Sequence, residues 1–159
     1  MKYLSIANTT DYLAVAIFDD ITLEHCEWQH IEDFQEQKRM KRWFEYVSHL
    51  IHTYSIGVVV MHEISDKLSK KQIERVSKVQ AIIQLACYEN KVVFLTPKTD
   101  GWERYITSGK NTLKKKLEIV NKGYDMNLVY DKNNFKVGFQ DIADAIILGE
   151  AIAHKRIHV

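Results

Sequence analysis

Two short segments, residues 56–63 (IGVVVMHE) and 91–97 (KVVFLTP), are nearly continuous runs of apolar residues, and each follows a stretch with helical periodicity. Such runs are typical of strands that are buried on both faces of a sheet. Strands that are joined through a helix run parallel, with a right-handed crossover. The alternation therefore predicts an α/β fold whose sheet has a parallel part.

The first 28 residues follow a different pattern. Residues 2–8 (KYLSIAN), 11–20 (DYLAVAIFDD) and 21–28 (ITLEHCEW) are short segments rich in β-branched and aromatic residues, separated by turn residues. Tight connections between strands predict antiparallel neighbours. The whole chain then predicts one domain over residues 1–159, with a mixed five-stranded sheet, three antiparallel strands followed by two parallel ones, and helices on both faces.

Four helices complete this scheme, at about residues 34–54, from Ser69 onward, at about 112–121 and at about 139–154. In the first helix an apolar stripe recurs at spacings of three and four residues, which is typical of a helix that packs on a sheet. Ser69 and Gln72 have the spacing of a capping box, which marks the start of the second helix.

Composition narrows the class of protein. Apolar residues make up 46% of the 159 residues, charged residues 27%, and the net charge is +1, which is typical of a soluble globular protein. No apolar run reaches the roughly 18–20 residues that span a bilayer, so we expect no membrane partner. Cys26 and Cys87 lack the spacing of a zinc or redox motif, which favours reduced thiols and a cytoplasmic location.

Basic residues cluster in two segments, and two interpretations stay open: solvated helix faces, or surfaces that bind phosphate. The first segment contains Lys67, Lys70, Lys71, Arg75 and Lys78. The second contains Arg104, Lys110, Lys114, Lys115, Lys116 and Lys122.

Three carboxylates stand out by position. Glu63 ends the apolar run VVVMHE, where a charge is costly without a partner, while Asp141 and Asp144 are three residues apart on one face of the last helix. Each has an ordinary explanation, because Asp141 could serve the helix N-terminus and Glu63 could cap a loop or pair with a lysine. Together they predict a Mg²⁺ site, since Mg²⁺ prefers oxygen ligands.

The chain resembles a known family in its order of elements and in several sequence motifs. The order of elements is similar to the ribonuclease H-like fold, and DIADAIILGEAIAHK resembles the C-terminal DxxDAxxxxxxHxx helix of the RuvC-type Holliday junction resolvases. VVVMHE resembles the apolar strand of that family that ends in Glu, and ITSGKNTLKKK is similar to its glycine-containing turn and basic helix start. The resemblance implies a homodimeric endonuclease that nicks four-way and other branched DNA by two-metal Mg²⁺ hydrolysis, with Mn²⁺ as a substitute.

By this resemblance Glu63, Asp141 and Asp144 match three of four family carboxylates, which hold the metal and act in catalysis. The fourth belongs in the first strand, where LSIANTT has Ala7 in place of the expected Asp. Two explanations stay open: an engineered Asp-to-Ala variant, favoured by retention of the other carboxylates, or a naturally impaired binder. Either one predicts a chain that binds junctions and cleaves them very poorly.

The same resemblance suggests residues that contact DNA. Lys110, Lys114 and Lys115 match the basic segment of the family, Lys98 and Arg104 are expected to flank it, and Lys114 falls near a lysine that assists catalysis. Family members often carry an aromatic residue shortly after the glutamate, but the stretch EISDKLSKKQ has none. That departure suggests a looser choice of branch, including replication forks. Trp102 and Tyr105 would either stack on bases or pack inside the protein.

Two other classes of protein are compatible with parts of this pattern. A branched-DNA-binding protein that never cuts would differ only in the natural identity of residue 7. An actin-like ATPase would need a much longer chain, and the stretch ANTT lacks the glycines of that class. The expected location is the cytoplasm of a bacterial cell or of a phage-infected host, with a phage-borne gene compatible with the short length.

Overall fold

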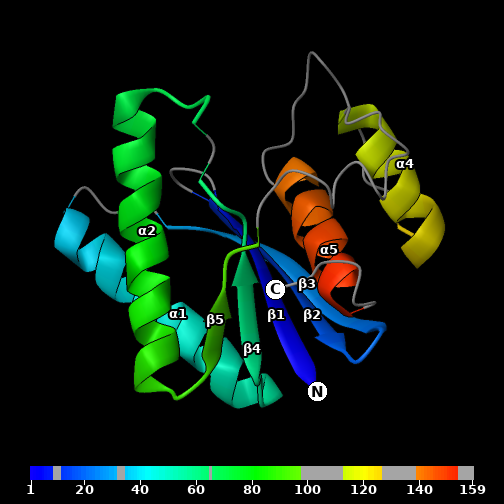
Figure 1. Ribbon diagram of the computed structural model, residues 1–159, viewed down its shortest axis with the longest axis horizontal. Helices are drawn as coiled ribbons and strands as arrows, with labels where there is room; N and C mark the ends of the chain where they lie inside the picture. The colour runs from blue at the N-terminus through cyan, green and yellow to red at the C-terminus, as the bar shows by residue number, and fades with distance from the viewer. Residues whose placement is uncertain (9–11, 32–34, 65, 98–112, 127–138, 154–159) are drawn as a thin grey trace.

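The computed structural model of the chain describes residues 1–8, 12–31, 35–64, 66–97, 113–126 and 139–153 (Figure 1). In these ranges the chain forms strands and helices in the order that the sequence predicts. Their bounds are β1 Lys2–Asn8, β2 Tyr12–Asp19, β3 Thr22–His30, α1 Glu36–Tyr54, β4 Val58–Met61, α2 Lys70–Glu89, β5 Val93–Leu95, α4 Leu113–Tyr124 and α5 Phe139–Ala153.

The strands form one mixed sheet with the order β3-β2-β1-β4-β5. The pairs β1–β2 and β2–β3 are antiparallel, while β1–β4 and β4–β5 are parallel. Because β4 and β5 each follow a helix, their parallel pairing is the one that helical crossovers require. The predicted α/β class and the mixed five-stranded sheet are confirmed.

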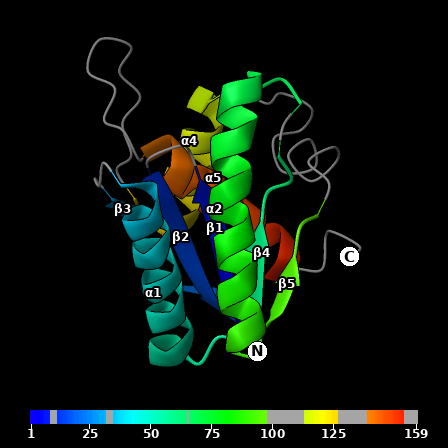
Figure 2. The ribbon, with the colours of Figure 1, turned by 90° about the vertical axis from the view of Figure 1, so that its left-hand side faces the viewer.

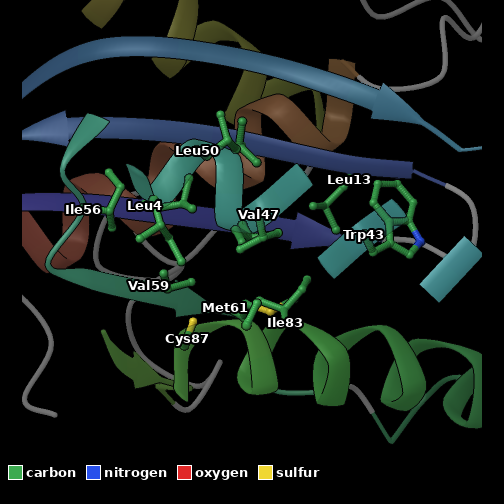
Figure 3. Packing of buried hydrophobic residues seen from close by; sticks show 14 of the residues in the cluster. Leu4, Leu13, Trp43, Val47, Leu50, Ile56, Val59, Met61, Ile83 and Cys87 are labelled. Carbon is green, nitrogen blue, oxygen red and sulfur yellow. The ribbon is translucent and has the colours of Figure 1, made fainter. Parts of the chain in front are cut away.

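Helices cover both faces of the sheet. Figure 2 shows α1 and α2 side by side on one face, and Figure 1 shows α5 on the other face with α4 outside it. On the face of α1 and α2, Leu4 of β1 forms one core with Trp43 and Val47 of α1 and Ile83 of α2 (Figure 3). This core uses the apolar stripe that the sequence predicts for the first helix.

The opposite face of the sheet is lined by small side chains. Ala7 of β1 with Ala14 and Ala16 of β2 form a core with α5, which contributes Ala145. A Cβ atom on Gly149 of α5 would lie only 2.7 Å from Cδ2 of Phe18 and 3.1 Å from Cβ of Ser5. Helix α5 therefore sits closer to the sheet than any larger residue at this position would allow.

The direction of α5 decides which of its residues reach the end of the sheet. Gly149, late in the helix, lies against Ser5 in the middle of β1. Figure 1 shows that α5 begins at the end of the sheet where β1 finishes. The first turns of α5 are thus brought to the carboxyl end of β1.

Two predicted strands differ from those observed. The run at residues 91–97 was expected to be buried on both faces, but β5 is a three-residue edge strand whose Val93 is 54% exposed. It is last in the sheet order, so only β4 lies beside it. Strand β4 is also shorter than the predicted residues 56–63, because its regular pairing ends at Met61.

Two further expectations concern loop segments and membrane crossing. The turn-rich segment at residues 98–110, and residues 127–131 of the predicted connection MNLVYD, lie outside the described residues. None of the described helices combines the length and the apolar character that a membrane crossing needs.

The close contact at Gly149 yields a prediction about stability. We expect Gly149→Ala to lower the free energy of unfolding by about 1–3 kcal/mol, because the added methyl group overpacks against Phe18 and Ser5. Gly123 of α4 is the matched control, since a Cβ atom there would meet nothing within 4 Å. Gly123→Ala is expected to raise stability by roughly 0.5–1 kcal/mol through helix propensity. Urea unfolding of both variants measures this, and equal effects would contradict the close approach of α5.

Candidate functional site at the carboxyl end of β1

The first two turns of α5 carry a pair of carboxylates. Asp141 and Asp144 are one helical turn apart and both are partly buried. Their neighbours in the helix, Ile142 and Ala145, belong to the same core as Ala7 of β1. The two carboxylates are therefore held beside the carboxyl end of β1, which is the usual location of sites in open α/β sheets.

Asp144 is paired with a buried cation. Nζ of Lys116, in α4, donates a hydrogen bond to Oδ1 of Asp144 over 2.9 Å, and Lys116 is only 8% exposed. A second contact joins the same helices, because the Tyr124 hydroxyl donates to Oε2 of Glu150 over 2.8 Å. Helix α4 is thus fixed on α5 in a position that places one ammonium group at the carboxylate pair.

Lys116 is a site residue that the sequence reasoning missed. It was counted in the second basic segment, while Lys114 was chosen as the lysine near the catalytic centre. The signal was present, because Lys116 precedes the buried Leu117 and Val120 and so falls on the apolar stripe of α4. The backbone of Lys114 lies in the first turn of α4, but its side chain lies outside the described structure, so its role stays a prediction.

Asp141 has a different environment from Asp144. Burial, and secondly the nearby negative charge of Asp144, raise the pKa of Asp141 from its ordinary 3.8 to about 6. Among the described side chains, no ion pair or hydrogen bond partner is found for Asp141. The pair therefore retains a repulsion that a hard cation between the two carboxylates would relieve, so these residues suit Mg²⁺ or Mn²⁺.

Glu63 is not gathered into this pair. It follows the last strand residue, Met61, by two positions and is exposed. The β1–β4 register aligns Ile6 with Met61, so the next step places His62 rather than Glu63 at the level of Ala7. Within the described ranges, no three His, Cys, Asp or Glu side chains form a group that could hold a metal ion. Glu63 thus lies at the same edge of the sheet, outside the carboxylate pair.

Ala7 lies in the core that the first turns of α5 join. It pairs with Ala14 of β2, is 4% exposed, and lies in the core under α5. Its methyl group offers no ligand, so the only carboxylates that the described structure brings together here are Asp141 and Asp144.

The remaining predicted contacts divide into two sets. Lys98, Arg104 and Lys110, with Trp102 and Tyr105, lie outside the described residues and stay predictions. Lys115 is described and is partly buried on α4.

The first basic segment divides in a similar way. Lys78 forms ion pairs with Glu36 at 2.8 Å and Glu74 at 3.4 Å, so it is a structural link between α1 and α2. Several other basic residues, at or just before the start of α2, are exposed: Lys67, Lys70, Lys71 and Arg75.

Solved structures share this fold. RuvC of Thermus thermophilus in complex with a Holliday junction substrate matches with a TM-score of 0.77 and 13% identity, over 98% of this chain and 95% of that one. The yeast mitochondrial Holliday junction resolvase matches with a TM-score of 0.70 and 13% identity, over 95% of this chain and 77% of that one. Fowlpox virus resolvase, in complex with Holliday junction DNA, matches with a TM-score of 0.61 and 18% identity, over 98% and 99% of the two chains.

These likenesses show that the chain has the ribonuclease H-like fold of RuvC and other Holliday junction resolvases. No family model matches the sequence, and no curated protein sequence matches it. At such low identity the shared property is the arrangement of strands and helices, which confirms the fold expected from the sequence motifs.

The Lys116–Asp144 pair leads to a prediction. We expect Lys116→Met to lower the free energy of unfolding by about 2–4 kcal/mol at neutral pH, because it leaves Asp144 shielded from water with Asp141 as its nearest charge. Exposed Lys122, on the same helix, is the control, and Lys122→Met should change stability by less than about 0.5 kcal/mol. Denaturant unfolding measures both, and matching small effects would show that the pair is not formed.

The raised pKa of Asp141 leads to a second prediction. A carboxyl group with a raised pKa in the folded state contributes stability at low pH, and this contribution is lost as pH rises through about 6. We therefore expect Asp141→Asn to stabilise the protein by about 1–3 kcal/mol at pH 7.5, and much less at pH 4. Thermal unfolding at both pH values measures the difference, with exposed Asp66→Asn as the control. A stability gain that is absent at pH 7.5 would contradict the unpaired, shielded carboxylate.

Proposed function

We propose that this protein binds four-way and other branched DNA, and that its site is that of a structure-selective endonuclease. The observation that carries the proposal is the carboxylate pair of α5, held at the carboxyl end of β1 in a fold shared with Holliday junction resolvases. The three solved structures named above come from proteins described as RuvC or as resolvases, and two of them contain Holliday junction DNA.

In this proposal Asp141 and Asp144 would hold Mg²⁺ or Mn²⁺ with Glu63 as a further ligand, and an Asp at position 7 would complete the set where Ala7 stands. The cation would supply positive charge where negative charge develops on the phosphodiester during hydrolysis. Lys116 fixes the orientation of the Asp144 carboxylate through the 2.9 Å hydrogen bond. Shielding of Asp141 from water strengthens its interaction with any cation that binds there.

Ala7 explains why we propose that this chain binds DNA and cleaves it poorly. An Asp in its place would lie beside the carboxylate pair, whereas the methyl group leaves the site one negative charge short. Of the predicted ligands in the described part of the chain, only the exposed Glu63 then adds a carboxylate to the pair. These features also favour a second candidate, a branched-DNA-binding protein that does not cut.

Part of the proposed DNA-binding surface lies at this end of the sheet. Exposed basic residues at the start of α2, two of which are Lys70 and Arg75, follow β4 and lie near the same edge as Glu63. We include with them the predicted contacts Lys98, Arg104, Lys110, Lys114 and Lys115. Contacts to phosphate would supply much of the affinity and make it depend on salt.

A homodimer is part of the same proposal, because a four-way junction has two equivalent strands to nick. Exposed apolar side chains suit such an interface: Leu85 and Tyr88 of α2 are 47% and 79% exposed, and Val93 of the edge strand β5 is 54% exposed. A two-fold dimer would bury such side chains on both subunits at once. The location proposed is the cytoplasm of a bacterial cell or of a phage-infected host.

Residue 7 provides the test between the two candidates. We expect Ala7→Asp to raise Mg²⁺-dependent nicking of a four-way junction by roughly 100-fold or more, because it supplies a missing ligand. Nicking is measured on labelled junction strands with Mg²⁺, with Mn²⁺ and with EDTA. Ala7→Asn is the matched control, because an Asn side chain has nearly the shape of Asp and carries no charge.

The outcomes separate the candidates clearly. Junction binding by the unchanged chain, with cutting restored in Ala7→Asp and absent in Ala7→Asn, supports the endonuclease. Binding without any gain in cutting supports the non-cleaving protein. Equal affinity for a junction and for linear duplex would contradict both.

A further inference from the structure

A cluster of three aromatic rings lies where the β2–β3 pair ends. The ring of Tyr12 stacks on His30 with a centroid distance of 4.3 Å and an interplanar angle of 13°. The same Tyr12 ring lies 5.6 Å from the ring of Trp28, tilted by 52°. Tyr12, Trp28 and His30 together are called the aromatic shelf below.

The register of the sheet places the shelf on the same face as the carboxylate site. Ala7 pairs with Ala14, and Ala14 pairs with Trp28, so the three residues form one row across β1, β2 and β3. Tyr12 pairs with His30 one step further along that face. Because neighbouring strands are about 4.8 Å apart, Trp28 lies roughly 10 Å from Ala7.

The shelf is accessible, although most of that face is covered. Trp28 is 41% exposed, while Cys26, the preceding residue of β3 on the same face, packs against the core under α5. Tyr12 and His30 are partly exposed. The exposed part of the Trp28 ring is therefore available to a ligand, with the rings of Tyr12 and His30 nearby.

The charges on β3 also leave this face open to an anionic ligand. Glu27, next to Trp28, lies on the opposite face, where it accepts a hydrogen bond of 2.8 Å from the Tyr46 hydroxyl of α1. His25, on that same face, lies 3.5 Å from Glu27 and stacks on Tyr54. The neighbouring carboxylate of β3 is therefore directed away from the shelf.

We propose that the aromatic shelf binds an unpaired or unstacked base of branched DNA, by stacking on Trp28. This inference rests on the proposed function, and it names a contact that sets which DNA is preferred. Stacking on an aromatic ring accepts any base, so the shelf would select an open branch point without selecting a sequence. A distance of roughly 10 Å from Ala7 equals about three base steps of a stacked strand, at 3.4 Å per step.

The geometry gives each ring a role. Trp28 offers the exposed face on which a base stacks, and Tyr12 supports it from β2. His30 holds Tyr12 in place through the nearly parallel stack. Trp28 is thus the residue whose removal should affect DNA binding most.

The test compares binding of the unchanged chain and its Trp28 variants to a four-way junction and to linear duplex of the same length. We expect Trp28→Leu, which keeps apolar bulk and loses the aromatic face, to weaken junction binding by roughly ten-fold, within the range of one base–aromatic stack. Duplex binding should change by less than about two-fold, since it depends on phosphate contacts. Trp28→Phe keeps a ring and should retain most of the junction affinity.

A spectroscopic measurement reports the contact directly. A junction with 2-aminopurine at the branch point should change its fluorescence when the unchanged chain binds, and this change should be lost with Trp28→Leu. The same probe placed in the middle of an arm should respond equally to both proteins. His25→Ala, which removes a ring from the other face of β3, is the matched control and should leave both signals unchanged. Thermal unfolding shows whether each variant is folded.

Failure of this inference is distinct from failure of the proposed function. If Trp28→Leu is folded and keeps the junction preference within two-fold, the shelf does not bind a base. Equal losses for junction and duplex would overturn the stacking role as well. If the unchanged chain shows no preference for the junction, the proposed function itself fails.

Discussion

The site depends on how closely α5 approaches the sheet. The contact is possible because Ala7, Ala14 and Ala16 line the sheet face and Gly149 has no side chain to meet Phe18. A helix held a few ångströms further out would leave the first turns of α5 in solvent, where Asp141 would titrate as an ordinary carboxyl group. The close contact late in α5 thus determines the electrostatics at the beginning of the helix.

The two carboxylates are balanced in unequal ways. Lys116 compensates Asp144 with a buried ammonium group, whereas Asp141 keeps a raised pKa from burial and from its neighbour. Full compensation of both would give a more stable protein and a weaker cation site, because an ammonium group would compete for the same oxygens. Partial compensation leaves a shielded negative charge, which is a common feature of sites that bind or react.

Much of the fold could be predicted because local signals agree with the tertiary structure. The first three strands have turn residues at their ends. The capping box of α2 forms as expected, with the Ser69 hydroxyl accepting a hydrogen bond from the backbone N–H of Gln72 over 3.2 Å. Burial was harder to predict, because the apolar run at β5 does not reveal that the strand lies at an edge. Lys116 falls on the apolar stripe of α4, but the stripe alone does not reveal that Asp144 of α5 is its partner. Glu63 was expected beside the pair because its strand was taken to continue beyond Met61.

The row of paired residues from Ala7 through Ala14 to Trp28 connects the carboxylate site with the aromatic shelf. Backbone pairing in the sheet sets the spacing between these residues, so it does not depend on loop conformation. The carboxylates reach one end of this row from α5, while the aromatic shelf forms its other end on β3. A strand of DNA that placed a phosphate at the carboxyl end of β1, beside the carboxylate pair, would therefore bring a nearby base within reach of Trp28. Because the strands are rigidly paired, one surface could bind a base at an open branch and at the same time position a phosphodiester at the carboxylate pair.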